Sequence, residues 1–136
     1  MARVKKINYT YAIGRRKSSA ARVRLYKGEG QNIVNEAPIG QYFPGVLAKG
    51  KWERAFDLTG TTGKYYVTVR VVGGGKNGQL EATVLGIARA FSKLNSEKYR
   101  VVLKKADLLT RDPRERQRRM VGTGGKARRQ KQSPKR

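Results

Sequence analysis

The excess of positive charge constrains this chain more than any other feature of its sequence. Lysine and arginine contribute 32 side chains and aspartate and glutamate only 9, so the formal net charge is +23 over 136 residues. A charge of this size repels itself in any compact structure. The chain therefore needs a polyanionic partner, and nucleic acid is favoured because closely spaced phosphates can neutralise many cations at once.

The amino acids that are absent exclude most kinds of enzyme. The sequence has no cysteine, which rules out disulfides, thiolate nucleophiles and cysteine-ligated zinc. It also has no histidine, which removes the usual general base near neutral pH and the commonest metal ligand. An oxygen-ligated metal site is not expected from so few carboxylates. We therefore expect no enzymatic activity and no cofactor.

Membrane association is also not expected. No apolar stretch reaches the ~18 residues of a membrane span, and no apolar segment of a signal peptide follows the basic N-terminus. The cations lie on predicted strands, turns and a glycine-rich tail rather than along one amphipathic helix. The sequence thus predicts an intracellular protein with no membrane partner.

Composition divides the chain near residue 110. Residues 111–136 carry 11 basic and 2 acidic side chains, and from Met120 onward almost nothing apolar. Such a segment cannot bury enough surface to offset its conformational entropy. We predict a globular domain over residues 1–110 and a basic tail over 111–136 that becomes ordered on RNA. Thr110 or Asp112 could cap a basic helix that begins at Pro113.

The spacing of apolar residues predicts a mixed α+β domain. Alternation predicts strands and helical spacing predicts helices. The expected strands cover 9–13, 21–26, 32–35 and 65–72, and the expected helices cover 38–43, 46–56 and 78–94. Periodicity leaves residues 99–103 open between strand and helix. An amphipathic sheet with helices packed on one face, and the other face open, follows from this pattern.

A glycine motif separates the clearest strand from the clearest helix. Gly73, Gly75 and Gly78 match G-x-G-x-x-G in the context of a dinucleotide site, but the chain has no second nucleotide-binding half. A second, phosphate-loop-like motif has Trp52 where magnesium requires Ser or Thr. Two interpretations of the first motif stay open. Its glycines let the backbone approach something closely, or they and Lys76 hold a phosphate at the helix N-terminus, which we favour.

Cations gather in a predicted hairpin turn at residues 14–18 and continue along the next strand. Arg22 and Arg24 share a strand face with Tyr26. Arginine with an interleaved aromatic suits an RNA backbone with occasional base stacking. The predicted RNA-binding residues of the hairpin, glycine turn and tail are Arg15, Arg16, Lys17, Ser18, Arg22, Arg24, Lys76, Arg111, Arg114, Arg118, Arg119, Lys126, Arg128 and Arg129.

Several stretches, taken together, resemble the family of bacterial-type small-subunit ribosomal protein nine. They are residues 14–24, 42–44, 57–60, 73–79, 86–90, 108–112 and the terminal pair 135–136. Each stretch is weak alone, but their order is highly specific and spans residues 9–136. The end of the chain departs from the family pattern, because Ser133 stands at the position of an aromatic residue and Pro134 at that of a serine.

The resemblance implies a fold and a function. The fold is a four-stranded mixed sheet with helices on one face, like the second domain of ribosomal protein five, plus an extended basic C-terminal tail. It includes a left-handed crossover, which general topology rules disfavour, and residues 99–106 are helical. The function is that of a structural constituent of the small ribosomal subunit that binds head-domain rRNA.

The resemblance also implies the partners. The tail threads through the head, and its last residues, Lys135 and Arg136, contact P-site tRNA. Other partners are neighbouring small-subunit head proteins, and we expect no homo-oligomer. Two other function classes are weighed against this one, a nucleic-acid packaging protein and a nucleotide-processing enzyme. The single tail and the glycine-bounded hairpin disfavour the first, and the lack of histidine and cysteine disfavours the second.

Overall fold

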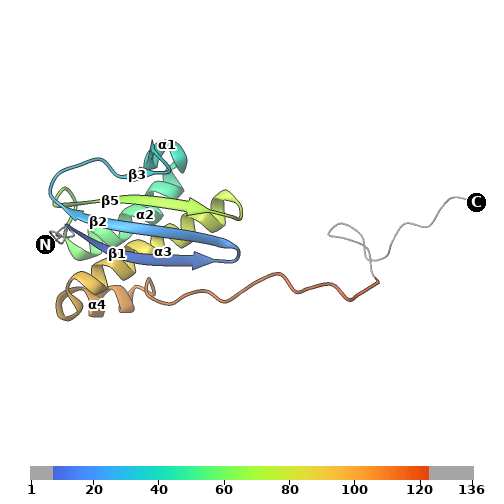
Figure 1. Cartoon of the computed structure of the whole chain (residues 1–136). Coiled ribbons are helices and arrows are strands. Elements are labelled where there is room, and N and C mark those ends of the chain that lie inside the picture. The colour runs from blue at the N-terminus through green and yellow to red at the C-terminus, as the bar shows by residue number, and fades with distance from the viewer. Residues whose placement is uncertain (1–7, 123–136) are drawn as a thin grey trace, which may run out of the picture.

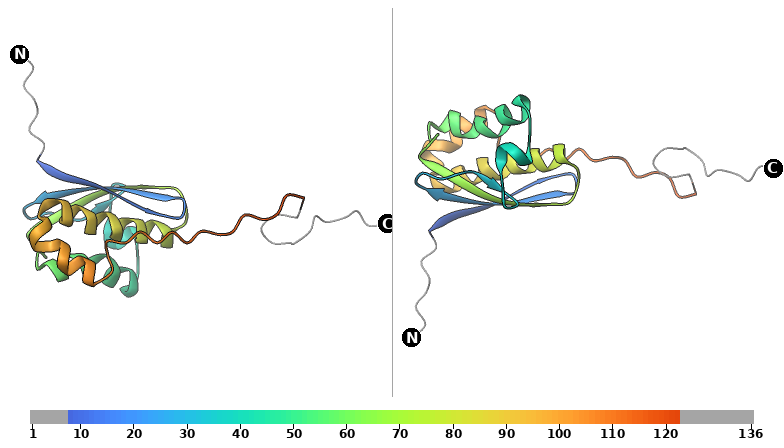
Figure 2. Two further views of the ribbon diagram at one scale, coloured as in Figure 1. Left: turned by 90° about the horizontal axis from the view of Figure 1, so that it is seen from below. Right: turned by 90° about the horizontal axis from the view of Figure 1, so that it is seen from above.

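The body of the protein is a single mixed sheet covered by helices on one face, as the computed structural model shows for residues 8–122 (Figure 1). The two further views in Figure 2 show the sheet edge-on, with every helix on the same side of the three long strands. The elements in chain order are β1 (Tyr9–Arg16), β2 (Ser19–Lys27), β3 (Ile33–Val34), β4 (Ala37–Pro38), α1 (Ile39–Tyr42), α2 (Val46–Thr59), β5 (Tyr65–Val72), α3 (Lys76–Leu94) and α4 (Ser96–Lys105). This confirms the predicted α+β class.

The strand order is β1-β2-β5-β3-β4, with β3 and β5 parallel and the other neighbours antiparallel. The connection from β3 to β5 passes through α1 and α2 behind the sheet and is left-handed, as the resemblance implies (Figure 1). The sheet has five strands rather than the expected four. The additional strand, β4, has only two residues, which is too short to show an alternating pattern.

Alternation sorts the side chains of the long strands between the two faces. In β2 the residues at odd positions from Ser19 to Leu25 are buried under the helices, and Arg22 and Arg24 are exposed on the other side. In β1 the inward residues Ala12 and Gly14 are small because α3 lies directly on this strand. A Cβ atom on Gly14 would lie 1.9 Å from the carbonyl oxygen of Ala82, and one on Gly86 would lie 2.5 Å from Val23 Cγ2.

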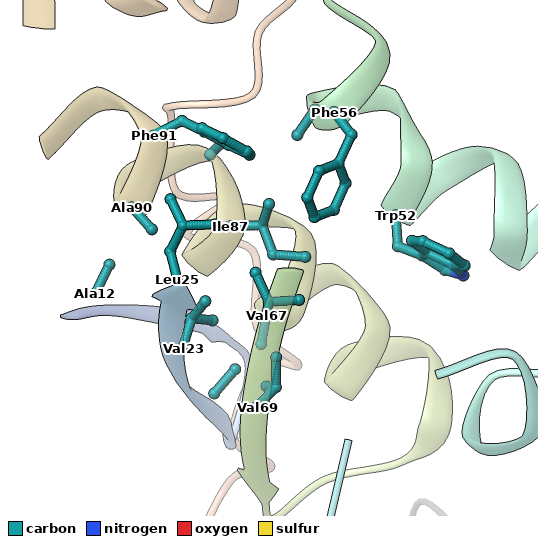
Figure 3. Packing of buried hydrophobic residues seen from close by; sticks show 14 of the residues in the cluster. Ala12, Val23, Leu25, Trp52, Phe56, Val67, Val69, Ile87, Ala90 and Phe91 are labelled. Carbon is teal, nitrogen blue, oxygen red and sulfur yellow. The ribbon is translucent and has the colours of Figure 1, made fainter. Parts of the chain in front are cut away.

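The aromatic part of the core is centred on α3. The ring of Phe91 lies 5.4 Å from that of Phe56, 5.9 Å from that of Tyr65 and 5.7 Å from that of Tyr99, in edge-to-face or near-perpendicular arrangements. In Figure 3, Phe91 and Ile87 point from α3 into the space between α2 and the strands. The contact with Tyr99 fixes α4, which confirms a helix over most of residues 99–106.

The helix predicted from Pro113 is wrong. Residues 111–120 carry no regular secondary structure and leave the body as an extended segment (Figure 1). The backbone carbonyl of Arg114, which a helix would pair with the amide four residues on, instead accepts a hydrogen bond from Arg16. Beyond Pro113 the segment has no apolar side chain before Met120, so it cannot bury a helical face. Within residues 8–122, no helix is long and apolar enough to cross a membrane.

Candidate nucleic-acid interface

The uncovered face of the sheet carries exposed arginines on its central strands, and we call it the open face. Arg22 and Arg24 of β2 and Arg70 of β5 are all exposed there. The register pairs Arg22 directly with Arg70. A hollow of about 1220 Å³ lies over this face, and Lys93 of α3 also contributes to its lining. Among the residues that the structure describes, Glu36 is the only acidic one in its lining.

These arginines have no acidic partners within residues 8–122. No carboxylate there forms an ion pair with Arg22, Arg24 or Arg70. The guanidinium of Arg24 lies 5.1 Å from the ring centroid of Tyr9, a cation–π contact. The face therefore holds positive charge that no carboxylate of residues 8–122 compensates. Like charges directly opposite on neighbouring strands, such as Arg22 and Arg70, destabilise a sheet. Arg70 is not among the RNA-binding residues predicted from the sequence. Its position opposite Arg22 depends on the pairing register of β2 and β5, which alternation within one strand does not predict.

A row of tyrosines crosses the open face at one end of the long strands. The register places Tyr9, Tyr26 and Tyr66 side by side on β1, β2 and β5. The rings of Tyr26 and Tyr66 stack at 5.1 Å and 11°, and those of Tyr9 and Tyr26 lie 5.6 Å apart. Gly30 lies against the ring of Tyr66, where a Cβ atom would come within 2.7 Å. Tyr26 is therefore flanked by protein rings on both sides, stacked on that of Tyr66 and tilted against that of Tyr9, which disfavours the expected base stacking.

The basic hairpin is tighter than expected. The two strands run to Arg16 and from Ser19, so the turn consists only of Lys17 and Ser18. Arg15, Lys17 and Ser18 are exposed, but Arg16 is buried, at 8% exposure, on the helix side. Ala12, Gly14 and Arg16 are buried at alternate positions of β1. The burial of Arg16 could therefore have been predicted by extending the alternation of the strand by two residues.

The glycine turn packs against this hairpin. The hydroxyl of Ser19 donates to the carbonyl of Gly73 at 3.0 Å, and a Cβ atom on Gly74 would lie 2.2 Å from that hydroxyl oxygen. Close backbone approach, the less favoured interpretation, is thus confirmed as one reason for the glycines. Lys76 lies with its Nζ 3.3 Å from the ring centroid of Tyr42, on the first turn of α3. A phosphate at this helix N-terminus stays a prediction.

Arg16 joins the hairpin to the start of the basic tail. Its Nε donates to Glu81 of α3 at 2.5 Å, its Nη1 to the carbonyl of Arg114 at 2.7 Å, and its Nη2 lies 3.4 Å from Asp112 Oδ2. Its side chain is only 10% exposed. We call Arg16, Glu81, Asp112 and Arg114 the arm junction, and residues 111–136 the arm. The junction fixes where the arm leaves the body.

Asp112 and Arg114 stabilise the local bend of the arm junction. Asp112 Oδ1 accepts the backbone N–H of Arg114 at 3.0 Å, and both carboxylate oxygens accept its guanidinium at 2.6 to 2.9 Å. The side-chain hydrogen bond from Arg114, followed by the backbone one, holds the pKa of Asp112 well below its usual range. The carboxylate in turn raises the pKa of Arg114. Just before this bend, Leu108 and Leu109 pack against the core.

The remaining predicted residues lie along the arm. Arg111 is half-buried and its Nη1 donates to the carbonyl of Asp112 at 3.4 Å, whereas Arg118 and Arg119 are exposed. Five predicted residues lie outside the described residues 8–122: Lys126, Arg128, Arg129, Lys135 and Arg136.

Comparison with known proteins decides the family. A sequence model described as ribosomal protein S9/S16 matches residues 14–136. The chain belongs to this family. The small ribosomal subunit protein uS9 of Solidesulfovibrio magneticus is 48% identical to it over 117 residues, which cover 86% of this chain and 89% of that protein.

Membership of the S9 family confirms the resemblance and the expected absence of enzymatic activity. The chain is a structural constituent of the small ribosomal subunit and acts in translation, with rRNA and neighbouring ribosomal proteins as its partners. A free packaging protein and a nucleotide-processing enzyme are thereby rejected.

Proposed function

We propose that the body of this protein binds rRNA of the small-subunit head domain and that its arm reaches P-site tRNA. In bacteria this takes place on cytoplasmic ribosomes. The body neutralises phosphates with the exposed hairpin residues Arg15, Lys17 and Ser18, with the open face, and with Lys76. The arm continues this contact through its basic residues, and Lys135 and Arg136 meet tRNA phosphates at its end.

The arm junction is the observation that carries this division of roles. It attaches the arm beside the exposed cations of the hairpin, and an otherwise buried arginine is used to do so. A segment that served only to bind RNA without specificity would need no such attachment. Arg16 is, in this proposal, a positioning residue, and its neighbour Arg15 is a phosphate contact.

Deletion of Lys135 and Arg136 tests the role of the arm. Two exposed ionic contacts contribute ~0.2–1 kcal/mol each, so the affinity of purified small subunits for P-site tRNA should fall about 2- to 30-fold. Incorporation of the protein into subunits should not change. Unchanged tRNA affinity in subunits that contain the shortened chain would overturn the tRNA role.

A matched variant removes the same charge from another part of the arm. Arg128→Gln with Arg129→Gln takes away two positive charges but leaves the terminal pair in place. We expect this variant to weaken assembly on head rRNA more than it weakens tRNA binding. Equal losses of tRNA affinity in the two variants would mean that only the total charge of the arm matters.

A further inference from the structure

The open face places two guanidinium groups opposite one another with nothing acidic between them. Arg22 and Arg70 are direct cross-strand partners on the two central strands of the sheet. Both are exposed, and within residues 8–122 neither side chain has a hydrogen bond or an ion pair. Two guanidinium groups that start from directly opposed strand positions on one face can both donate to the oxygens of a single phosphodiester.

The surroundings favour a backbone over bases at this place. The tyrosine row beside the arginines has its central ring, Tyr26, flanked by Tyr9 and Tyr66, and the guanidinium of Arg24 lies over Tyr9. A sheet that binds unpaired bases needs open aromatic faces on which they stack. The charged residues that remain exposed on the central strands of this face are Arg22, Arg24 and Arg70, beside the exposed apolar side chains of Ile13 and Val72.

Side chains of α3 occupy two backbone carbonyls on the β1 edge of the sheet, which disfavours a protein strand as the occupant of this edge. Arg89 of α3 donates to the carbonyl of Ile13 at 3.0 Å, and Lys93 donates to that of Tyr11 at 3.1 Å. These carbonyls of β1 would otherwise be free to pair with an added strand. This favours a partner that lies on the face itself, over its basic residues.

We propose that the open face binds the sugar–phosphate backbone of rRNA and that Arg22 and Arg70 together hold one phosphate. This rests on the proposed rRNA binding and adds the subsite and the mode of recognition. The phosphate replaces the repulsion between the two arginines with two charge-assisted contacts. The repulsion between Arg22 and Arg70 thus lowers the stability of the free protein, and binding of RNA removes this destabilisation.

Arg22→Gln, Arg70→Gln and the double variant test the shared phosphate. The probe is a transcript of the small-subunit head rRNA, and its affinity is measured between about 50 and 200 mM salt. One lost phosphate contact lowers the slope of log K against log salt by about 1. The double variant should lose about one contact in total, and the single losses should not add. Additive losses totalling about two contacts would overturn the shared phosphate.

The same variants should make the free protein more stable, which a purely structural role of these arginines would not do. Relief of cross-strand repulsion should raise Tm by about 1–5 °C at low salt. Arg100→Gln on α4 removes the same charge from the helix side, so it controls for the general effect of net charge. A Tm rise no larger than that of the control would contradict the repulsion between Arg22 and Arg70.

Three outcomes separate this proposal from the proposed function. If the wild-type protein does not bind the transcript, rRNA binding itself fails. If the wild-type protein and the double variant bind it equally, only the open-face proposal fails. If binding is equal but the double variant enters reconstituted subunits poorly, the face contacts a neighbouring protein, which also overturns the proposal.

Tyr26→Leu tests recognition of the backbone against stacking of bases. Loss of a stacked base costs ~1–3 kcal/mol, or about 5- to 150-fold in affinity. We expect less than a twofold change in affinity for the transcript, with the fold checked by circular dichroism. A loss of tenfold or more in a folded Tyr26→Leu variant would show that the face stacks bases.

Discussion

The open face and the arm junction use the same side chain for opposite purposes. In the arm junction, Arg16 has an acceptor for each part of its guanidinium, and Asp112 holds Arg114 in a forked pair. On the open face, Arg22 and Arg70 face each other without any carboxylate partner among residues 8–122. In a chain of such high charge, the number of cations therefore does not identify those that are available to RNA. The presence or absence of an acidic neighbour separates the cations that are paired within the protein from those that are available.

Arg15 and Arg16 show the contrast over one step of the chain. Because successive side chains of a strand point to opposite faces, Arg15 is exposed and Arg16 is buried against α3. The two residues are chemically identical and adjacent in sequence. One is available to an external phosphate, and the other positions the arm.

The largest expected effect is on stability after loss of Arg16. Arg16→Gln leaves Glu81, Asp112 and a backbone carbonyl without their shared donor. Charged hydrogen bonds that are lost in a partly buried site cost about 1–3 kcal/mol. The free energy of unfolding from urea titration should fall by that amount.

Two variants sharpen this result. Arg15→Gln makes the same change one residue earlier at an exposed position, and it should alter the unfolding free energy by less than ~0.5 kcal/mol. Arg16→Lys keeps the charge but cannot supply a planar fork, so it should lose most of the stability that Arg16→Gln loses. Full stability in Arg16→Lys would show that charge alone matters at the arm junction.

The direction of the arm should change in the same variants. The chain has no cysteine, so spin labels at Gln31→Cys and Gln117→Cys report one distance between the body and the arm. Arg16→Gln should broaden the distribution of this distance in the free protein, because the arm loses its attachment. Arg15→Gln should leave it unchanged, and equal broadening in both would contradict a positioning role for Arg16.

Much of the fold follows from periodicity in the sequence. The alternation over 65–72 and the helical spacing over 78–94 predict β5 and α3 nearly to their observed ends. The two-residue strands β3 and β4 are beyond such prediction, because pairs of residues have no periodicity and depend on the neighbouring strand. The left-handed connection was implied only by the family resemblance, since general rules disfavour it.

The site was predicted less completely than the fold. Arg15 and Lys17, which the sequence predicts to bind RNA, are exposed in the structure. Arg16 was grouped with them because the turn was expected to begin at Gly14. The helix at Pro113 was expected from good capping residues, and tertiary contacts of Arg16 override them. Arg70 was missed because its importance comes from facing Arg22 across two strands that are far apart in sequence.

A charge reversal on the open face should make it resemble the arm junction. Arg70→Glu places a carboxylate opposite Arg22 and converts a repulsive pair into an ion pair. Cross-strand pairs of opposite charge contribute ~0.2–1 kcal/mol, so the free protein should gain stability of that order in urea titration. Its affinity for the head rRNA transcript should fall by more than that of Arg70→Gln, because the new carboxylate repels phosphate.

Arg100→Glu is the matched control for this reversal, since it changes the net charge equally on the helix side of the body. The difference between the two variants isolates the facing geometry from the long-range effect of charge. If both variants gain the same stability and lose the same affinity, the open face is not a distinct site.

The smallest expected effect is the pH dependence of the arm junction. The pKa of Asp112 is held below its usual range by its hydrogen bonds from Arg114. A carboxylate whose pKa is lower in the folded state contributes stability that is complete above its unfolded value of about 3.9, and that is lost as the pH falls through the lower folded value. The arm should therefore stay attached from neutral pH down to about 4, and its attachment should weaken only in stronger acid.

Carbon-detected NMR of the Asp112 carboxyl group measures this directly, because the group should remain ionised at a pH where an aspartate of ordinary pKa is already protonating. Arg114→Gln removes the fork and should return the titration of Asp112 towards its ordinary range. If Asp112 titrates in the ordinary range of an aspartate in the wild-type protein, the forked pair does not persist in solution, and Arg16 alone holds the root of the arm. The contrast with the open face would then depend on one arginine rather than on a network.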